Sequence, residues 1–190
     1  MFEASTYMER RKGLRERVGS GLILFLGNDP PPMNYADNPY HFKQDSSFLY
    51  YFGLNQAGLA GVIDADSGEE IIFGHEPTLD EIVWMGPLPT LASECAHVGV
   101  TRSEEPEKLG EMLRAGRDAG RTIHFLPQYR AWNRIKLARM LGIPGLSTDD
   151  HVSRPLLEGV VDQRLYKTDE EVAEIEIAID VMNLPPKDAD

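Results

Sequence analysis

Cysteine is almost absent from this sequence, because Cys95 is the only one among 190 residues. A single cysteine excludes a disulfide within the chain and any zinc site built mainly from thiolates. Its neighbours, in the stretch LASECAHV, are apolar with a helical pattern, which favours a small buried side chain over a reactive nucleophile. This cysteine usage is typical of a reducing compartment, so the cytoplasm is the expected location.

Long apolar runs and basic charge are also scarce. No window approaches the roughly 20 apolar residues that a membrane-spanning helix needs. The N-terminal stretch MFEASTYMERRKGLRERV lacks the apolar centre of a signal peptide. With 19 basic against 31 acidic residues, the formal net charge is −12. Phosphate backbones and anionic membranes would be repelled overall, and we expect neither nucleic acid nor a membrane as a partner.

Familiar catalytic motifs are missing as well. The histidines never show HExxH spacing, and the sequence contains neither a GxSxG nucleophile elbow nor a glycine-rich phosphate loop. Asp149, Asp150 and His151 form the most tempting cluster for a metal, but adjacent loop residues point in different directions. A solvated loop is the preferred interpretation, and we expect no catalytic and no metal-binding residue in this chain.

The residues that are present indicate a globular domain, with 42% hydrophobic and 26% charged residues. Strands and helices alternate without a fixed repeat, which favours an α/β layer architecture. Two apolar runs separated by Asp66-Ser67-Gly68 predict a β-hairpin, and helices between other strands predict crossover connections. The expected sheet is therefore mixed and flanked by helices. We expect strands at 21–27, 59–63, 71–73 and 121–127, and helices at 7–18, 46–52, 78–86, 103–120, 131–141 and 170–182.

Two of these helices begin with the spacing of a capping box, Thr6 with Glu9 and Thr168 with Glu171. The first of them should be a surface helix with one apolar stripe. The residues that we expect to face inward from it are Tyr7, Met8, Leu14 and Val18.

The stretch HFKQDSSFLYYFGL (41–54) places a polar cluster directly before an aromatic run. Asp45 is suited to cap the N-terminus of a two-turn helix, and Gly53 is suited to a left-handed position at its C-terminus. Phe48, Tyr51 and Phe52 fall on one face of that helix, so we expect them to be buried. This structural interpretation leaves Asp37, Lys43 and Gln44 unexplained.

Three segments in order carry a resemblance to a known family. ADNPYHFKQDSSFLYYFG (36–53), WMGP (84–87) and RPLLEGVVDQRLYKTDEEVAEIE (154–176) resemble successive signatures of the N-terminal domain of Xaa-Pro aminopeptidases. These enzymes are the aminopeptidase P branch of the creatinase and prolidase family, peptidase family M24. The similarity extends over residues 1 to about 182.

The resemblance implies an α/β domain of ribonuclease H-like architecture over residues 1–166, followed by a linker helix and tail over 167–190. In that family, catalysis belongs to a following pita-bread domain. There, two aspartates, a histidine and two glutamates hold two divalent ions, usually manganese, that generate a hydroxide for attack on the Xaa–Pro bond. These five ligands have no counterpart here, so the chain is expected to be catalytically inert by itself and to need no cofactor.

The same resemblance implies a role in oligomer contacts and in gating peptide substrates at a neighbouring subunit. Asp37 and Trp84 match positions at the rim of that neighbour's active site, the carboxylate facing a substrate amine and the indole covering an apolar group. Lys43, Arg154 and Arg164 are the candidates for contact with the catalytic domain. Because Lys43 stands where arginine is commoner, any bidentate carboxylate contact there becomes a single-point contact.

The main hypothesis is therefore a non-catalytic N-terminal domain of an Xaa-Pro metalloaminopeptidase, a hydrolase that removes the residue preceding proline, active as a homo-oligomer. One alternative is a free-standing oligomerisation or peptide-binding module without enzyme activity. A second alternative is a small hydrolase whose site the motifs do not reveal. For Trp84 and Asp37, packing of a short helix and a solvated loop carboxylate are the respective structural explanations.

Overall fold

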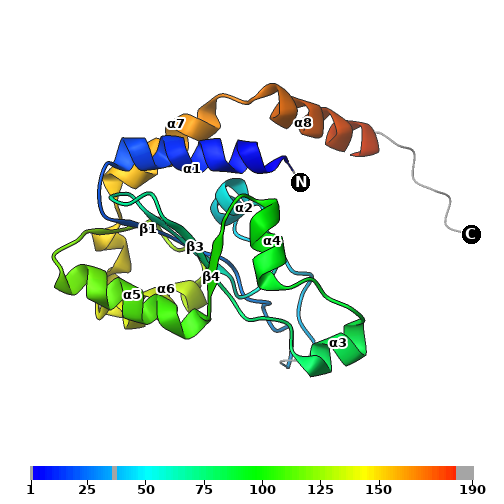
Figure 1. Cartoon of the computed structure of the whole chain (residues 1–190), viewed down its shortest axis with the longest axis horizontal. Coiled ribbons are helices and arrows are strands. Elements are labelled where there is room, and N and C mark those ends of the chain that lie inside the picture. Colours follow the sequence, from blue (N-terminus) through cyan, green and yellow to red (C-terminus); the bar gives the residue numbers. More distant parts are fainter. Residues whose placement is uncertain (1, 36–37, 183–190) are drawn as a thin grey trace, which may run out of the picture.

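The computed structural model describes residues 2–35 and 38–182 and contains one mixed β-sheet (Figure 1). Its strands are β1 (Leu22–Leu26), β2 (Ala60–Asp64), β3 (Glu70–Phe73), β4 (Arg102–Glu104) and β5 (Ile123–Phe125). They lie in the order β4-β3-β2-β1-β5. β2 pairs antiparallel with β1 and β3, whereas β5 is parallel to β1 and β4 is parallel to β3. The predicted mixed sheet flanked by helices, with its hairpin, is confirmed.

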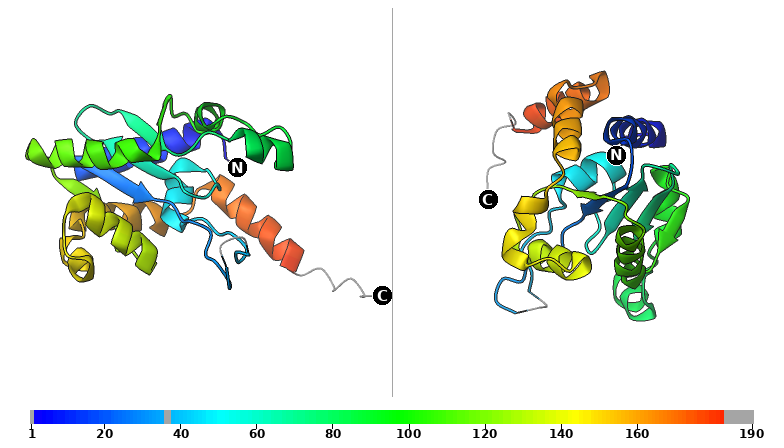
Figure 2. Two further views of the ribbon diagram at one scale, coloured as in Figure 1. Left: turned by 90° about the horizontal axis from the view of Figure 1, so that it is seen from below. Right: turned by 90° about the vertical axis from the view of Figure 1, so that its left-hand side faces the viewer.

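Helices cover both faces of the sheet (Figure 2). They are α1 (Ala4–Val18), α2 (Ser46–Phe52), α3 (Leu79–Met85), α4 (Leu91–His97), α5 (Pro106–Asp118), α6 (Ala131–Leu141), the 3-10 helix η1 (Gly145–His151), α7 (Arg154–Leu165) and α8 (Asp169–Met182). One apolar cluster joins the sheet to α1, α2, α4 and α7, and a second joins it to α5 and α6. The core therefore consists of two layers with the sheet between them.

The central strand β1 shows why the sequence forms this sandwich. All five of its residues, LILFL, are buried. Ile23 and Phe25 belong to the cluster with α1 and α2, while Leu22, Leu24 and Leu26 belong to the cluster with α5 and α6. Successive side chains point to opposite faces of a strand, so a continuous apolar run requires cover on both faces.

The predicted helices and strands are found, but residues 103 and 104, expected to begin a helix, belong to the unpredicted strand β4, and α5 begins only at Pro106. The helices η1 and α7 were not predicted either. Two details of α1 also differ. α1 begins at Ala4 with Glu3 at the N-cap position and no capping side chain, so the predicted Thr6 capping box is wrong. Met8 is 48% exposed, although its apolar character suggested an inward position. By contrast, the second predicted box is confirmed, because the backbone N–H of Glu171 donates to Thr168 Oγ1 at 3.3 Å and that of Thr168 donates to Glu171 at 3.0 Å.

A buried arginine holds α1 to the rest of this layer. Arg11 is fully buried and donates to the carbonyl oxygens of Tyr51 at 2.8 Å and Val98 at 2.9 Å. Its Nε donates to the carboxylate of Glu70 on β3 at 2.8 Å. Burial lowers the pKa of Arg11, and the charge of Glu70 opposes that effect. One guanidinium thus connects α1, α2, α4 and β3, because it satisfies acceptors from three of them.

Within the described ranges, none of the helices combines the length and the apolar character that crossing a bilayer requires.

Candidate functional site

The helix α2, at the centre of the polar and aromatic stretch, is a structural element. The carboxylate of Asp45 accepts from the backbone N–H groups of Ser47 and Phe48, each at 2.9 Å, as predicted. Gly53 ends the helix with φ +67°, where a Cβ atom would also collide with the ring of Tyr7. The cap requires the carboxylate of Asp45, and the close approach to Tyr7 requires a glycine at position 53. The predicted burial is confirmed for Phe48, Tyr51 and Phe52, each with 0% exposure.

Gln44 also has a structural role that the sequence left unexplained. Its Oε1 accepts from the backbone N–H groups of Asn28 at 2.7 Å and Asp45 at 2.9 Å. Its Nε2 donates to the carbonyl oxygen of Gln56 at 2.6 Å. This buried amide therefore ties the segment after β1 to both ends of α2. Sequence reasoning could not find this role, because each of its partners is a backbone group that no side-chain motif indicates.

Lys43 and Arg164 lie near the N-terminal end of α2. The side chain of Lys43 is exposed, and its backbone carbonyl accepts from Asn28 Nδ2 at 2.9 Å. Arg164, on α7, donates to Ser47 Oγ at 3.4 Å and lies over the ring of Tyr50 at 5.4 Å. Asp37 lies outside the described residues. Arg154, at the start of α7, is exposed and pairs with Glu158 at 2.8 Å along the same helix.

Trp84 lies elsewhere, on the short helix α3, which projects from the body of the domain (Figure 1). A complete capping box starts this helix: Glu81 N–H donates to Thr78 Oγ1 at 3.2 Å, and Thr78 N–H donates back to Glu81 at 2.8 Å. The hydrogen bond from Gly86 N–H to the Ile82 carbonyl closes it at 2.9 Å. The helix is thus well formed although none of its residues is buried.

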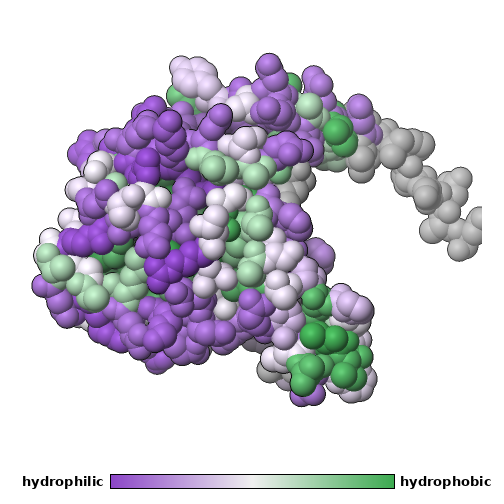
Figure 3. All heavy atoms as spheres, in the orientation of Figure 1, coloured by the Kyte–Doolittle hydropathy of each residue, from purple (hydrophilic) through white to green (hydrophobic). Residues whose placement is uncertain are grey.

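The exposed side chains of α3 are mainly apolar and form one of the green patches in Figure 3. We call α3 and its exposed apolar residues the α3 arm: Leu79 is 81% exposed, Val83 78%, Trp84 85% and Met85 74%. Packing of a short helix, the structural explanation for Trp84, is therefore wrong. Contiguous exposed apolar surface of this kind is unusual for a surface that only water contacts.

A second exposed apolar surface lies on α8. Its Val172, Ile175, Ile177, Ile179 and Met182 are between 42% and 84% exposed. Near its start, Glu171 pairs with Arg10 of α1 at 3.2 Å, and Arg10 also donates to the carbonyl oxygen of Tyr50 at 2.9 Å. Sequence reasoning missed the contacts of Arg10 and Arg11. The sequence feature that could have indicated them is the pair of adjacent arginines within an otherwise amphipathic helix.

The described part of the chain offers no metal centre. Among residues 2–35 and 38–182, no group of three or more His, Cys, Asp or Glu side chains could hold a metal ion. Asp149, from the cluster considered in the sequence, pairs with Arg134 at 3.0 Å. The described residues do not fit a pair of divalent ions, and no metal-dependent step is assigned to them.

Two side chains of types that often take part in catalysis, Cys95 and His124, are held in unreactive states by burial. Burial, together with the charges of Glu76 and Glu94, raises the pKa of the Cys95 thiol to about 11. The thiol therefore stays protonated near neutral pH, as expected for a buried small side chain. His124 is buried. Its Nδ1 accepts a hydrogen bond from the hydroxyl of Ser153 at 2.6 Å, and its Nε2 donates to the carbonyl oxygen of Ser20 at 2.9 Å. Burial lowers its pKa.

Comparisons with known proteins agree with this arrangement. The family model described as "Aminopeptidase P, N-terminal domain" matches residues 7–124. Mitochondrial intermediate cleaving peptidase 55 of Arabidopsis thaliana is 32% identical over 112 residues, covering 57% of this chain and 22% of that protein. Xaa-Pro dipeptidase of Rattus norvegicus is 25% identical over 176 residues, covering 85% of this chain and 32% of that protein.

Solved structures show the same fold. Zinc-substituted Escherichia coli aminopeptidase P in complex with product matches with a TM-score of 0.70 at 20% identity. Proline aminopeptidase P II from Yersinia pestis matches with a TM-score of 0.71 at 18% identity. Each match covers 90% of this chain and 41% of the solved chain. The chain thus spans about a third or less of the curated relatives above and about two fifths of these structures, and it belongs to the aminopeptidase P N-terminal domain family.

Proposed function

We propose that this chain is the non-catalytic N-terminal domain of an Xaa-Pro metalloaminopeptidase and that it serves subunit assembly and substrate gating. The observation that carries the proposal is the α3 arm, a well-capped helix that exposes its apolar residues and Trp84. An exposed indole is a suitable cover for an apolar side chain or a proline ring on a second protein surface. Asp37 would supply the carboxylate of the same rim.

Contact with a catalytic domain is proposed for a different part of the molecule. Lys43 and Arg164 lie near one end of α2, and Arg154 is exposed at the start of α7. The exposed apolar residues of α8 extend this region, since Arg10 attaches the start of α8 to α1. Residues 1–166 would form the domain and 167–190 the connection. The partner domain would hold two divalent ions, with manganese as the expected metal, and the protein would act in the cytoplasm.

Self-association tests the assembly part of this proposal. We expect the sedimentation coefficient of the purified 190-residue chain to rise with concentration, and Trp84→Asp to keep the chain monomeric. Trp132→Asp is the matched control, because Trp132 is another exposed tryptophan, 63% accessible, on a different helix. A chain that stays monomeric, or associates equally well with Trp84→Asp, would contradict the proposed role of the arm.

An activity assay tests the non-catalytic part. With added manganese, we expect no cleavage of peptides that carry proline in second position, because the described residues hold no metal cluster. Manganese-dependent cleavage by the chain alone would favour the small-hydrolase alternative. Self-association that an added Xaa-Pro aminopeptidase catalytic domain does not change would favour the free-standing module.

A further inference from the structure

A pocket lies outside all the surfaces discussed so far, where the parallel strands β1 and β5 end. The segments that follow these strands, 27–32 and 126–130, border it together with the start of α6. Its volume is about 710 Å³, and its lining is formed by Asp29, Pro30, Pro31, Pro32, Arg130, Ala131, Trp132 and Asn133. Crevices at the carboxyl ends of parallel strands are the usual ligand sites of open α/β sheets, and this volume suits a small molecule.

Hydrogen bonds between the two segments hold the pocket in shape. Asn28 Nδ2 donates to the hydroxyl of Tyr129 at 3.0 Å, and Arg130 donates to the carbonyl oxygen of Asp29 at 3.3 Å. From α6, the amide nitrogen of Asn133 donates to the carbonyl oxygen of Gly27 at 3.3 Å. These contacts cross about 100 residues of sequence, so the pocket is formed before any ligand arrives.

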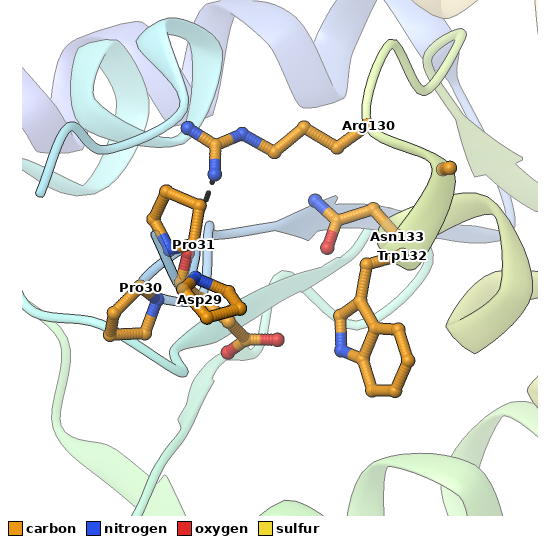
Figure 4. A pocket seen from close by; sticks show the side chains of 8 residues that line it. Asp29, Pro30, Pro31, Arg130, Trp132 and Asn133 are labelled. Carbon is orange, nitrogen blue, oxygen red and sulfur yellow. Dashed lines mark hydrogen bonds between the residues drawn. The ribbon is translucent and has the colours of Figure 1, made fainter. Parts of the chain in front are cut away.

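The side chains on its walls would attract a cation. Figure 4 shows the carboxylate of Asp29 facing the indole of Trp132 across the pocket, with the amide oxygen of Asn133 turned toward the space between them. Among the residues that the structure describes, the Asp29 carboxylate has no ion pair and no hydrogen bond, and Trp132 is 63% exposed. A carboxylate, an amide oxygen and an indole face all interact favourably with an N–H cation.

The rest of the lining requires that this cation carry an apolar body. Three consecutive proline rings and the methyl group of Ala131 form much of the wall, and none of them offers a hydrogen-bond donor. The guanidinium of Arg130 donates to the carbonyl oxygen of Asp29 at 3.3 Å, and in Figure 4 the Asp29 carboxylate points away from it, toward Trp132. The net charge of −12 further favours a positively charged ligand over an anion.

A second hollow, which also borders Asp29 and Trp132, is less suited to a cation with an apolar body. It has about 410 Å³ and shares Asp29 and Trp132 with the pocket, and Glu107, Lys136 and Arg139 also line it. It is smaller than the pocket and lacks the run of three prolines that would contact an apolar body. The cation is therefore expected on the proline side of the indole.

We propose that this pocket binds a small organic ammonium ion with an apolar body, its N–H groups donating to Asp29 and Asn133 and its charge lying against the Trp132 ring. This binding is independent of the α3 arm and of any catalytic domain. It would give the domain a small-molecule site of its own, for an amine that is not being cleaved.

Tryptophan fluorescence can report the binding directly, because the chain has two tryptophans. In the Trp84→Phe variant, Trp132 is the sole tryptophan, and we expect benzylammonium chloride to change its emission with a dissociation constant on the order of 1 mM. Benzyl alcohol, a neutral analogue of the same shape, should bind at least about tenfold more weakly, and sodium phenylacetate should not bind.

Substitutions on the same background separate a built site from a general apolar surface. Asp29→Asn should weaken benzylammonium binding about tenfold, and Asp118→Asn, an exposed carboxylate at the end of α5, should leave it unchanged. Equal binding of benzyl alcohol and benzylammonium, or full binding by Asp29→Asn with native circular dichroism, would overturn the proposal. Because neither the assembly assay nor the cleavage assay enters these titrations, failure here would leave the proposed function standing.

Discussion

The helices α2 and α3 have equal length and similar local signals but opposite surroundings. Each has seven residues, a capping side chain at its start and a glycine at its end. α2 buries Phe48, Tyr51 and Phe52 completely, whereas α3 buries none of its residues and exposes 85% of Trp84. Local sequence therefore determines that a helix forms, while long-range packing determines whether its apolar face has a partner within the chain.

Truncation of one aromatic side chain in each helix should give the largest contrast. Phe52 stacks on Phe48 with ring centroids 5.2 Å apart and also contacts Phe25 at 6.0 Å. We expect Phe52→Ala to lower the free energy of unfolding by about 3–5 kcal/mol, because it leaves a cavity in the core. Trp84→Ala should change it by less than about 0.5 kcal/mol. Urea denaturation followed by circular dichroism measures both, and similar losses would remove the contrast between the helices.

Buried and exposed arginines sharpen the same comparison. Arg11→Met would leave the Glu70 carboxylate and two buried carbonyl oxygens without their donor, so we expect a loss of about 3 kcal/mol. Arg102 on β4 pairs at 2.7 Å with Glu69, which directly precedes the neighbouring strand β3, but both side chains are more than two fifths exposed. Arg102→Met should cost less than about 1 kcal/mol in the same denaturation experiment. A larger loss for Arg102 than for Arg11 would contradict this ranking.

Removal of the helix caps should have a smaller effect that also differs between the two helices. Asp45→Ala is expected to lower global stability by about 1 kcal/mol, because α2 is packed into the core. Thr78→Ala should leave global stability nearly unchanged and instead speed amide hydrogen exchange within residues 79–85, because α3 can unfold locally. Exchange of α3 amides at the rate of global unfolding in the unsubstituted protein would show that the arm is not a separate unit.

The smallest expected effect is a pH dependence in the buried layer. Because burial lowers the pKa of His124, the unfolded chain binds its proton more readily than the folded chain does. The contribution of His124 is therefore complete above its ordinary pKa of about 6.5 and is lost as the pH falls toward the folded value. The slope cannot exceed about 1.4 kcal/mol per pH unit for one proton.

His124→Gln should remove this slope between pH 7.5 and 5.5. Substitution of the exposed His41 serves as the matched control and should preserve it. Denaturant midpoints measured across this range compare the two variants. Loss of the slope in His41→Gln, or its persistence in His124→Gln, would assign the effect to another group.

The sequence predicts the local parts of this molecule well. The Asp45 cap, the Gly53 terminus and the buried aromatic face of α2 follow from spacing and backbone geometry alone, and the structure confirms them. The two-sided burial of β1 follows from its uninterrupted apolar run. The family resemblance indicated the fold, which the family match and the solved structures support.

Sequence patterns failed where partners come from distant segments. Gln44 and Arg11 bind mainly backbone carbonyl and N–H groups, which every residue has and no pattern reveals. Thr6 has the spacing of a capping box, but the helix begins two residues earlier. The pocket beside Trp132 combines segments about 100 residues apart, so its Asp29 could not be distinguished from other loop carboxylates.

The central claim is that the α3 arm contacts a second protein surface, and Trp84 can report that contact by itself. In a Trp132→Phe variant, Trp84 is the sole tryptophan, and its fluorescence can be followed from about 1 to about 500 μM chain. We predict a shift of emission to shorter wavelength and weaker acrylamide quenching as the chain associates. A fully water-exposed Trp84 in samples that sedimentation shows to be associated would contradict the account.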